Sequence, residues 1–535
     1  MRPSSPPTIA IVGGGIAGLA AAWELVKDAD GGDHTPVEVH LLEAGDRVGG
    51  KLRSADFAGR RVDLAADAFL ARRPEATALC HELGLTEDLV PVGASGASVW
   101  ARGQLRRLPA GLNLGVPTRW LPLFRSGILS PGESLRAARD LVAPHRGDQT
   151  ADDDRSVGAI VGERLGRPIV ERLVDPLVGG INAGRVDDLS AAVTFPQLLA
   201  ASRQSGSLMR RLAQPPAGAD GLSPPEPGPL FWSLSGSTAS LADSLAEALS
   251  RRGVTIHTGV SVRSVEPHPD GPSGAPQWEL ALQGTDGSEQ ETAGRPHDPP
   301  SLRADRVILA VPAGEAAVLV GPHAPEAAVL LDSIAYASVA VVTLSVPRRA
   351  IRAPLRGTGF LVPLASPIAG GPALITGCTY LARKWPHLAG ADDELLRVSV
   401  GRSGDSRHRD LSDDELTASA FGELTELLDI RDVPLDSLVT RWDEAFPQYA
   451  VDHATSVGRI ERAVAALGSV AVAGAAYGGV GIPACIGSGR AAARRMLDSL
   501  SLDSLSLSPG SGSPGSGASG SDASGDEPAP PELGK

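Results

Sequence analysis

Long hydrophobic runs, cysteine, lysine and aromatic side chains are all scarce in this chain of 535 residues. No segment reaches the roughly eighteen consecutive apolar residues that span a bilayer, and the longest apolar stretch, 334–346, predicts a buried strand. Three widely spaced cysteines exclude a disulfide framework and argue against a metal site. A net charge of −14 without a basic stripe argues against nucleic acid as a partner. The N-terminus lacks the apolar core of a signal peptide, so we expect a soluble, cytoplasmic protein without a transmembrane anchor.

The most informative feature is a strand, a glycine-rich turn and a helix near the N-terminus. The apolar run 8–12 leads into Gly13-Gly14-Gly15-Ile16-Ala17-Gly18 and then into the helix-forming run 19–25. In such a turn the first glycine permits the bend, the second lets a pyrophosphate approach the backbone, and the third lets the helix pack on the strand. A second strand, 37–42, ends at Glu43, whose carboxylate suits a ribose diol. The spacing predicts a site for an adenine dinucleotide.

A second glycine element follows directly on that acidic residue. The run Ala44-Gly45-Asp46-Arg47-Val48-Gly49-Gly50-Lys51 brings backbone and two cations close to a further part of the cofactor. A nicotinamide dehydrogenase does not need this Arg-x-Gly-Gly element, whereas a flavoprotein does.

The segment 470–500 repeats the order strand, glycine turn, helix, with the helix expected at 491–500. A helix N-terminus there would stabilise the negative charge of a reduced flavin.

The order of elements predicts a chain of several domains. A helix is expected at 74–83, ending at Gly84, and a mainly helical region at 104–188, with capping boxes beginning at Ser130 and, further on, at Ser412. Surface loops are expected at 28–36, 213–229 and 266–300, and part of the last segment, 278–282, is also a candidate for one strand of a hairpin. The tail 501–535 is too poor in apolar residues to offset its ordering entropy, so we expect it to be disordered.

Taken together, these motifs resemble the FAD-dependent protoporphyrinogen and coproporphyrinogen III oxidases of the amine oxidase superfamily. Stretches at 176–184, 383–387, 441–449 and 478–486 carry the more specific part of a match that spans about 8–498. The resemblance implies an α/β fold: a Rossmann-like FAD-binding domain of the glutathione reductase/amine oxidase type, with an inserted mixed-sheet substrate domain and a helical subdomain. The expected division is 1–90, 230–318 and 440–500 for the FAD-binding domain, 91–195 for the helical subdomain, and 196–229 with 319–439 for the substrate-binding domain.

The resemblance also implies which residues contact FAD. Ala65 departs from the family, which usually has glycine there, so contacts at that loop are less certain. The expected contacts are Gly13, Gly14, Gly15, Ile16, Ala17, Gly18, Glu43, Ala44, Arg47, Gly50, Lys51, Ala65, Ala66, Asp67, Ala68, Val260, Trp442, Val480, Gly481 and Ile482. Substrate carboxylates need cations, for which Arg72 and Arg73 are candidates, and Tyr380 and Tyr449 are candidates for the cavity wall. No catalytic acid–base pair is evident.

The activity implied by the resemblance is the oxidation of coproporphyrinogen III to coproporphyrin III in heme biosynthesis, by hydride transfers to FAD, with O2 reduced to hydrogen peroxide. A transient contact with the next enzyme of that pathway is expected, and the oligomeric state is open. Three alternatives remain: protoporphyrinogen IX as the substrate, a flavin amine oxidase that uses Lys384, and a non-catalytic flavin-binding scaffold.

Overall fold

The computed structural model describes residues 6–28, 36–142, 153–214, 228–268, 277–284, 300–364, 366–368 and 370–506. Most of the loops expected at 28–36, 213–229 and 266–300 lies outside these residues, and so does the tail beyond 506. Among the described residues, no helix is both long and apolar enough to cross a membrane.

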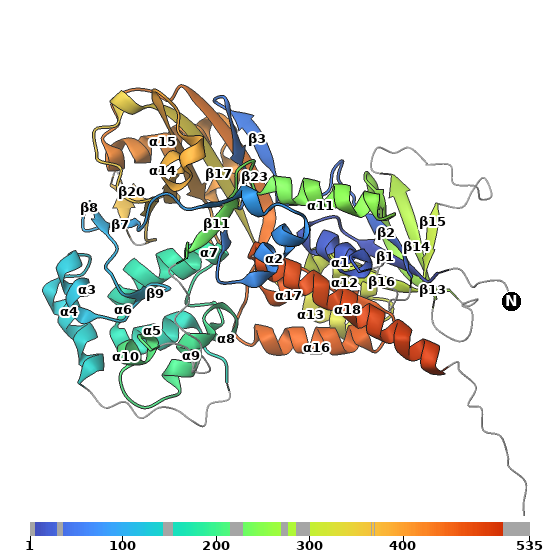
Figure 1. The fold of residues 1–535 in the computed structure, drawn as a ribbon. Helices are drawn as coiled ribbons and strands as arrows, with labels where there is room; N and C mark the ends of the chain where they lie inside the picture. The colour runs from blue at the N-terminus through green and yellow to red at the C-terminus, as the bar shows by residue number, and fades with distance from the viewer. Residues whose placement is uncertain are drawn as a thin grey trace, which may run out of the picture.

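A five-stranded parallel sheet contains the N-terminal strand and its glycine turn (Figure 1). The strand order is β12-β2-β1-β16-β24, and every neighbouring pair is parallel. The bounds are β1 Thr8–Val12, β2 Glu38–Leu42, β12 Thr255–His257, β16 Arg306–Leu309 and β24 Val470–Val472. Because both faces of the sheet are covered, its strands are nearly continuous apolar runs.

Alternate residues of β1 pack into two different cores. Ile9 and Ile11 belong to the core formed with α1, α11 and α18, whereas Ala10 and Val12 belong to the core formed with α12, α13 and α16. Their bounds are α1 Ile16–Val26, α11 Ala239–Arg251, α18 Ile482–Ser506, α12 Ala313–Val320, α13 Pro325–Asp332 and α16 His453–Ala465. The close packing of α18 on α1 requires glycine at 489, where a Cβ would lie 2.0 Å from the Ala17 carbonyl oxygen.

Small antiparallel sheets adjoin this layer. One has the order β13-β14-β15, a second has the order β5-β11-β6, and a third is the hairpin β3-β4. Their bounds are β13 Val260–His268, β14 Gln277–Gly284, β15 Ser301–Ala304, β5 Phe69–Leu70, β11 Phe231–Leu234, β6 Leu89–Pro91, β3 Ser54–Phe57 and β4 Arg60–Asp63. The hairpin and β5 flank the loop 64–68, which contributes to the site described below.

A seven-stranded sheet occupies the upper left of Figure 1, with the order β23-β17-β22-β21-β18-β7-β8. Its bounds are β23 Asp436–Pro447, β17 Tyr336–Pro347, β22 Asp393–Val400, β21 Ile375–Tyr380, β18 Gly359–Leu361, β7 Ser98–Ala101 and β8 Gln104–Arg107. Helix α15 (Asp413–Leu428) packs its apolar residues against one face, where Leu396 and Val398 of β22 point. By strand alternation, Arg397 and Ser399 point to the other face.

A helical layer lies below that sheet in Figure 1 and has its own core. Its elements are α3 Trp120–Ser126, α4 Pro131–Ala138, α5 Val157–Leu165, α6 Arg167–Ile169, α7 Gly180–Asn182, α8 Ala191–Thr194, α9 Pro196–Ser202 and α10 Leu208–Leu212. Between α6 and α7 the chain forms a π-helix, Val170–Gly179, that contains Pro176. π-Helical segments occur mostly at functional sites.

The structure confirms the α/β fold class and many local expectations. Helix α2 (Pro74–Glu82) ends before Gly84, which has a positive φ, and both predicted capping boxes form. Two expectations were wrong. The region 104–188 begins with strands, because β8 pairs with β7 in the seven-stranded sheet. The helix expected at 491–500 begins at Ile482 and continues to Ser506, so residues 501–506 are helical.

The domain boundaries stay a prediction, although two features differ from them. β7 and β8 fall within 91–195 yet belong to the seven-stranded sheet, and α9 and α10 fall within 196–229 yet pack in the helical core. Both differences arise because pairing and packing partners distant in the sequence decide where a segment belongs.

Candidate active site

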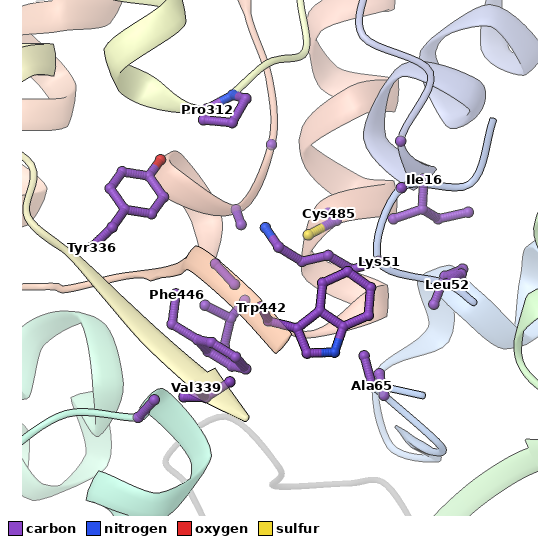
Figure 2. A pocket seen from close by; sticks show the side chains of 18 of the residues that line it. Ile16, Lys51, Leu52, Ala65, Pro312, Tyr336, Val339, Trp442, Phe446 and Cys485 are labelled. Carbon is purple, nitrogen blue, oxygen red and sulfur yellow. The ribbon is translucent and has the colours of Figure 1, made fainter. Parts of the chain in front are cut away.

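A cavity of about 1410 Å³ extends from the N-terminal glycine turn to the seven-stranded sheet. Its walls come from the β1–α1 turn, the end of β2, the loop 64–68, the start of β13 and the N-terminus of α18. Further walls come from the π-helix and from β17, β18, β21, β22 and β23. Figure 2 shows the centre of this cavity, where Lys51, Trp442, Cys485 and Tyr336 come from four different segments.

One end of the cavity is formed by the glycine turn before α1. A Cβ at Gly15 would meet no atom within 4 Å, so the space beside this residue is open. A Cβ at Gly18 would lie 2.0 Å from the Gly13 carbonyl oxygen, which confirms the close approach of helix to strand expected there. The first N–H groups of a helix have no partner within the helix, and its N-terminus favours an anion. The turn therefore provides a cradle in which a pyrophosphate fits.

The carboxylate of Glu43 is fixed at the same end of the cavity. Its Oε2 accepts a hydrogen bond of 2.7 Å from the backbone N–H of Gly14, and its Oε1 accepts one of 2.7 Å from that of Gly45. These bonds orient the carboxylate where β2 ends, beside the glycine turn. A carboxylate held in this way can accept further hydrogen bonds from a ribose.

Lys51 lies in the middle of the cavity, beside Cys485 and Trp442 (Figure 2). Its side chain is open to the cavity, but protein atoms surround it on most sides. This partial loss of contact with water lowers the pKa of its amine. Burial raises the pKa of the Cys485 thiol to about 11, although the charge of Lys51 opposes the shift. The indole N–H of Trp442 donates to the Leu64 carbonyl oxygen at 3.1 Å. Lys51 thus supplies a cation in the part of the cavity between the glycine turn and Trp442.

Asp67 anchors the loop 64–68 to the seven-stranded sheet. Its oxygens accept hydrogen bonds from Lys384 Nζ at 2.9 and 3.0 Å and from the Trp385 indole N–H at 2.9 Å. Arg397 Nη2 lies 3.1 Å from Oδ2, and its Nη1 donates to the Ala65 carbonyl oxygen. Burial by itself would raise the pKa of Asp67, but the charges of Arg397 and Lys384 hold it well below its usual range. Asp67 is therefore ionised and neutralises two cations of the cavity.

A second carboxyl group, Asp63, lies in the same loop region. Its Oδ1 accepts a hydrogen bond from the backbone N–H of Thr238 at 3.0 Å. The Thr238 hydroxyl lies 2.8 Å from this Oδ1 and 2.7 Å from the Ala66 carbonyl oxygen, so its single proton is shared between the two acceptors. Burial, and then the charge of Asp67, raise the pKa of Asp63 to about 6. The backbone at 63–67 is thus held by side chains from α11, β22 and β23.

Most of the predicted contacts lie at this one cavity. Those that line it are Gly13, Gly15, Ile16, Ala17, Glu43, Ala44, Gly50, Lys51, Ala65, Ala66, Asp67, Val260, Trp442, Val480, Gly481 and Ile482. Four others do not. Gly14 and Gly18 shape the turn, Arg47 donates to the Leu52 carbonyl oxygen at 3.1 Å, and Ala68 packs near Trp385.

The four side chains expected at a substrate do not line the cavity. Arg72 is exposed, and Arg73 pairs with Glu75 at 2.9 Å. Tyr380 is buried against Phe360, and the Tyr449 hydroxyl donates to the Ala475 carbonyl oxygen at 2.6 Å. The cations that line the cavity are other residues.

The cavity contains three arginines that sequence reasoning missed, Arg263, Arg397 and Arg402. Arg397 is the only charge within the apolar run 395–400, and such a residue is buried with a partner more often than it is solvated. The sequence therefore contained a signal by which Arg397 could have been found. The pairing of Arg402 with Asp175, 227 positions away, was not visible in the sequence.

A cradle for a pyrophosphate, a carboxylate for a ribose and a long cavity that continues to a second domain define a dinucleotide-dependent oxidoreductase. The chain belongs to the flavin-containing amine oxidoreductase family, whose model matches residues 16–497.

Particular relatives are similar over nearly the whole chain. A coproporphyrinogen III oxidase of Bacillus subtilis is 32% identical over 90% of this chain and 96% of its own length. A protoporphyrinogen oxidase of Bos taurus is 30% identical over 92% and 98%. A solved structure described as a protoporphyrinogen oxidase of Exiguobacterium sp. 255-15 superposes with a TM-score of 0.76, at 30% identity, over 93% of this chain and 99% of that one.

The protein is therefore an FAD-dependent oxidoreductase. The open space beside Gly15 and the fixed carboxylate of Glu43 fit the diphosphate and the adenosine ribose of FAD, and the cation of Lys51 lies further along the same cavity. Which individual residues contact FAD is a proposal that rests on this fit.

Proposed function

We propose that this enzyme oxidises coproporphyrinogen III to coproporphyrin III, with protoporphyrinogen IX as a poorer substrate. The observation that carries the proposal is the 32% identity, over 90% of the chain, to a coproporphyrinogen III oxidase. The cavity supports it, because about 1410 Å³ exceeds the roughly 300–1,000 Å³ of a typical small-molecule site, and the wall beyond Lys51 continues onto the broad face of the seven-stranded sheet.

The overall reaction removes six electrons and six protons from the porphyrinogen. FAD supplies the chemistry by accepting hydride, and three O2 would be reduced to three hydrogen peroxide molecules as it is reoxidised. The protein's part is to hold a meso carbon of the flexible macrocycle close to the cofactor and to exclude water. Apolar residues of β18 and of the π-helix, including Phe360, Leu361 and Leu177, form a wall suited to that task.

A flavin amine oxidase is the second candidate, because the family description names amines. The lysine that this reading requires is Lys384, and its Nζ is bound by both oxygens of the buried Asp67. The amine is therefore engaged by the Asp67 carboxylate and is not free to reach a substrate. This contact favours the porphyrinogen reading.

The test compares aerobic turnover of coproporphyrinogen III, protoporphyrinogen IX and a panel of amines by the FAD-loaded enzyme. Porphyrin fluorescence and peroxide release are recorded together. We expect three peroxides per porphyrin and a larger kcat/KM for coproporphyrinogen III than for protoporphyrinogen IX. Turnover of an amine with inertness toward both porphyrinogens would assign the protein to the second candidate, and inertness toward all substrates would favour a non-catalytic scaffold.

A further inference from the structure

Arg402 is a cation of the cavity wall that was not among the site residues expected from the sequence. Arg402 follows β22 and is 4% exposed, yet it lines the cavity beside Val400 and Gly401. Its Nη1 donates to Asp175 Oδ2 at 2.8 Å. Among the described residues, its Nε and Nη2 have no hydrogen-bond acceptor, and neither atom is fully enclosed. These donors therefore remain in contact with the cavity.

The other cations of the cavity are already engaged or lie elsewhere. Lys384 and Arg397 share the carboxylate of Asp67. Arg263 comes from β13, on the side of Glu43, and donates to Gln283. Lys51 lies between the glycine turn and α18, in the part of the cavity that suits FAD. Among the cations of the described residues that line the cavity, Arg402 lies on the side of the seven-stranded sheet and keeps two guanidinium nitrogens, Nε and Nη2, without an acceptor.

The surroundings of Arg402 make an unpaired anion costly. The wall that the π-helix, α7 and β18 contribute to the same cavity is apolar at Leu177, Ile181, Phe360 and Leu361. A carboxylate moved from water into this apolar part of the cavity needs a charged donor. A guanidinium has five N–H groups in a planar fork, so one edge can hold Asp175 while the other binds a second carboxylate.

Asp175 fixes the guanidinium in place. It lies in the π-helix, where its Oδ1 accepts a hydrogen bond from the backbone N–H of Val186 at 3.2 Å. A further bond joins the same regions, because the N–H of Ser403 donates to the Ala183 carbonyl oxygen at 2.7 Å. The Arg402 side chain is therefore held by both the helical layer and the sheet, and it does not need to be ordered when a ligand arrives.

We propose that Arg402 binds a propionate carboxylate of the tetrapyrrole through its free guanidinium edge, with Asp175 as the residue that positions it. This assignment rests on the proposed function. It predicts opposite effects for the two members of the ion pair, because Arg402 attracts the substrate carboxylate and the charge of Asp175 repels it. A pair that only joined two layers of the protein would give effects of the same sign.

The experiment titrates coproporphyrin III, the stable oxidised product, into FAD-loaded enzyme and follows porphyrin fluorescence. Arg402→Gln should weaken binding by about 10- to 100-fold, the loss typical of a charged hydrogen bond, and Arg402→Lys should recover part of it. Asp175→Asn keeps the acceptor for Val186 and removes the charge that repels a substrate carboxylate, so it should tighten binding on the order of 5-fold. It also leaves the buried Arg402 without its anion, so its melting temperature should fall.

A buried pair away from the cavity provides the matched control. Arg164 and Asp140 are joined at 2.8 Å within the helical core, and neither lines the cavity. Arg164→Gln should lower the melting temperature without changing porphyrin affinity. If Arg402→Gln does not fold, Asp175→Asn decides the question alone: unchanged or weaker porphyrin binding overturns the proposal.

Different results would overturn the proposed function and the Arg402 assignment. Wild-type enzyme that neither oxidises coproporphyrinogen III nor binds coproporphyrin III would overturn the proposed function, and the Arg402 assignment with it. Wild-type enzyme that does both, combined with equal losses in Arg402→Gln and Asp175→Asn, would overturn only the Arg402 assignment.

Discussion

Replacing Gly15 by alanine should separate cofactor binding from folding. The backbone at Gly15 has φ −68°, which alanine adopts without strain, and its new methyl group would meet no protein atom within 4 Å. Folding of the apoprotein should therefore be unaffected, or favoured by about 0.4–1 kcal/mol through the less flexible unfolded chain.

FAD binding should respond in the opposite direction. The methyl group would occupy the space through which a pyrophosphate approaches the turn, and overpacking of this size costs about 1–3 kcal/mol. That cost corresponds to a Kd for FAD raised about 5- to 150-fold. The assay is titration of apoprotein with FAD, followed by flavin fluorescence, with melting curves recorded in its presence and absence.

Gly458→Ala is the matched control, because this glycine lies within α16, away from the cavity, and a Cβ there also meets no atom within 4 Å. It should leave FAD affinity unchanged. If Gly15→Ala binds FAD as tightly as the wild type does, the diphosphate does not lie at this turn and the assignment of the site is wrong.

Three further outcomes are expected. Gly18→Ala should lower the free energy of unfolding of the apoprotein by at least about 1–3 kcal/mol, because its methyl group would lie 2.0 Å from the Gly13 carbonyl oxygen; a urea midpoint equal to wild type would contradict this. Asp67→Asn leaves two buried cations without their anion and should cost about 3–5 kcal/mol, seen as a large fall in melting temperature, whereas a small change would mean that water solvates them. The carboxyl of Asp63 has its pKa raised from 3.8 to about 6, so it contributes stability below pH 4 that is lost as the pH rises through 6. Asp63→Asn should therefore resist urea better than wild type at pH 7.5, by up to about 3 kcal/mol, and equally at pH 4; a difference that does not vary with pH would refute the titration.

Local sequence patterns predicted the cofactor end of the site well. The glycine turn, the acidic residue after β2 and Lys51 are close in sequence, and the physical requirements of a dinucleotide at a helix N-terminus are met by residue type and spacing alone. Sixteen of the twenty expected FAD contacts line one cavity. Short-range hydrogen bonding similarly explains why both capping boxes were found in the structure where expected.

Contacts between residues far apart in the chain were not visible in the sequence. Arg72 and Arg73 were chosen because they follow Asp67 closely, yet the cations that meet Asp67 come from α14 (Leu381–Lys384) and β22. Nothing local distinguishes an arginine that turns to solvent from one that pairs inside a cavity. The free edge of Arg402 is equally invisible before Asp175 is placed beside it.

The amino-acid sequence by itself determined the fold class, the family and the dinucleotide-binding turn, because these depend on periodicity and on residues within a few positions of one another. Only the tertiary structure decided which cations face the substrate side and which are neutralised. A charged side chain that is removed from water needs a partner of opposite charge, and that partner decides whether the charge is available to a ligand. In this protein the partners are distant in the sequence: Lys384 and Asp67 are separated by 317 positions.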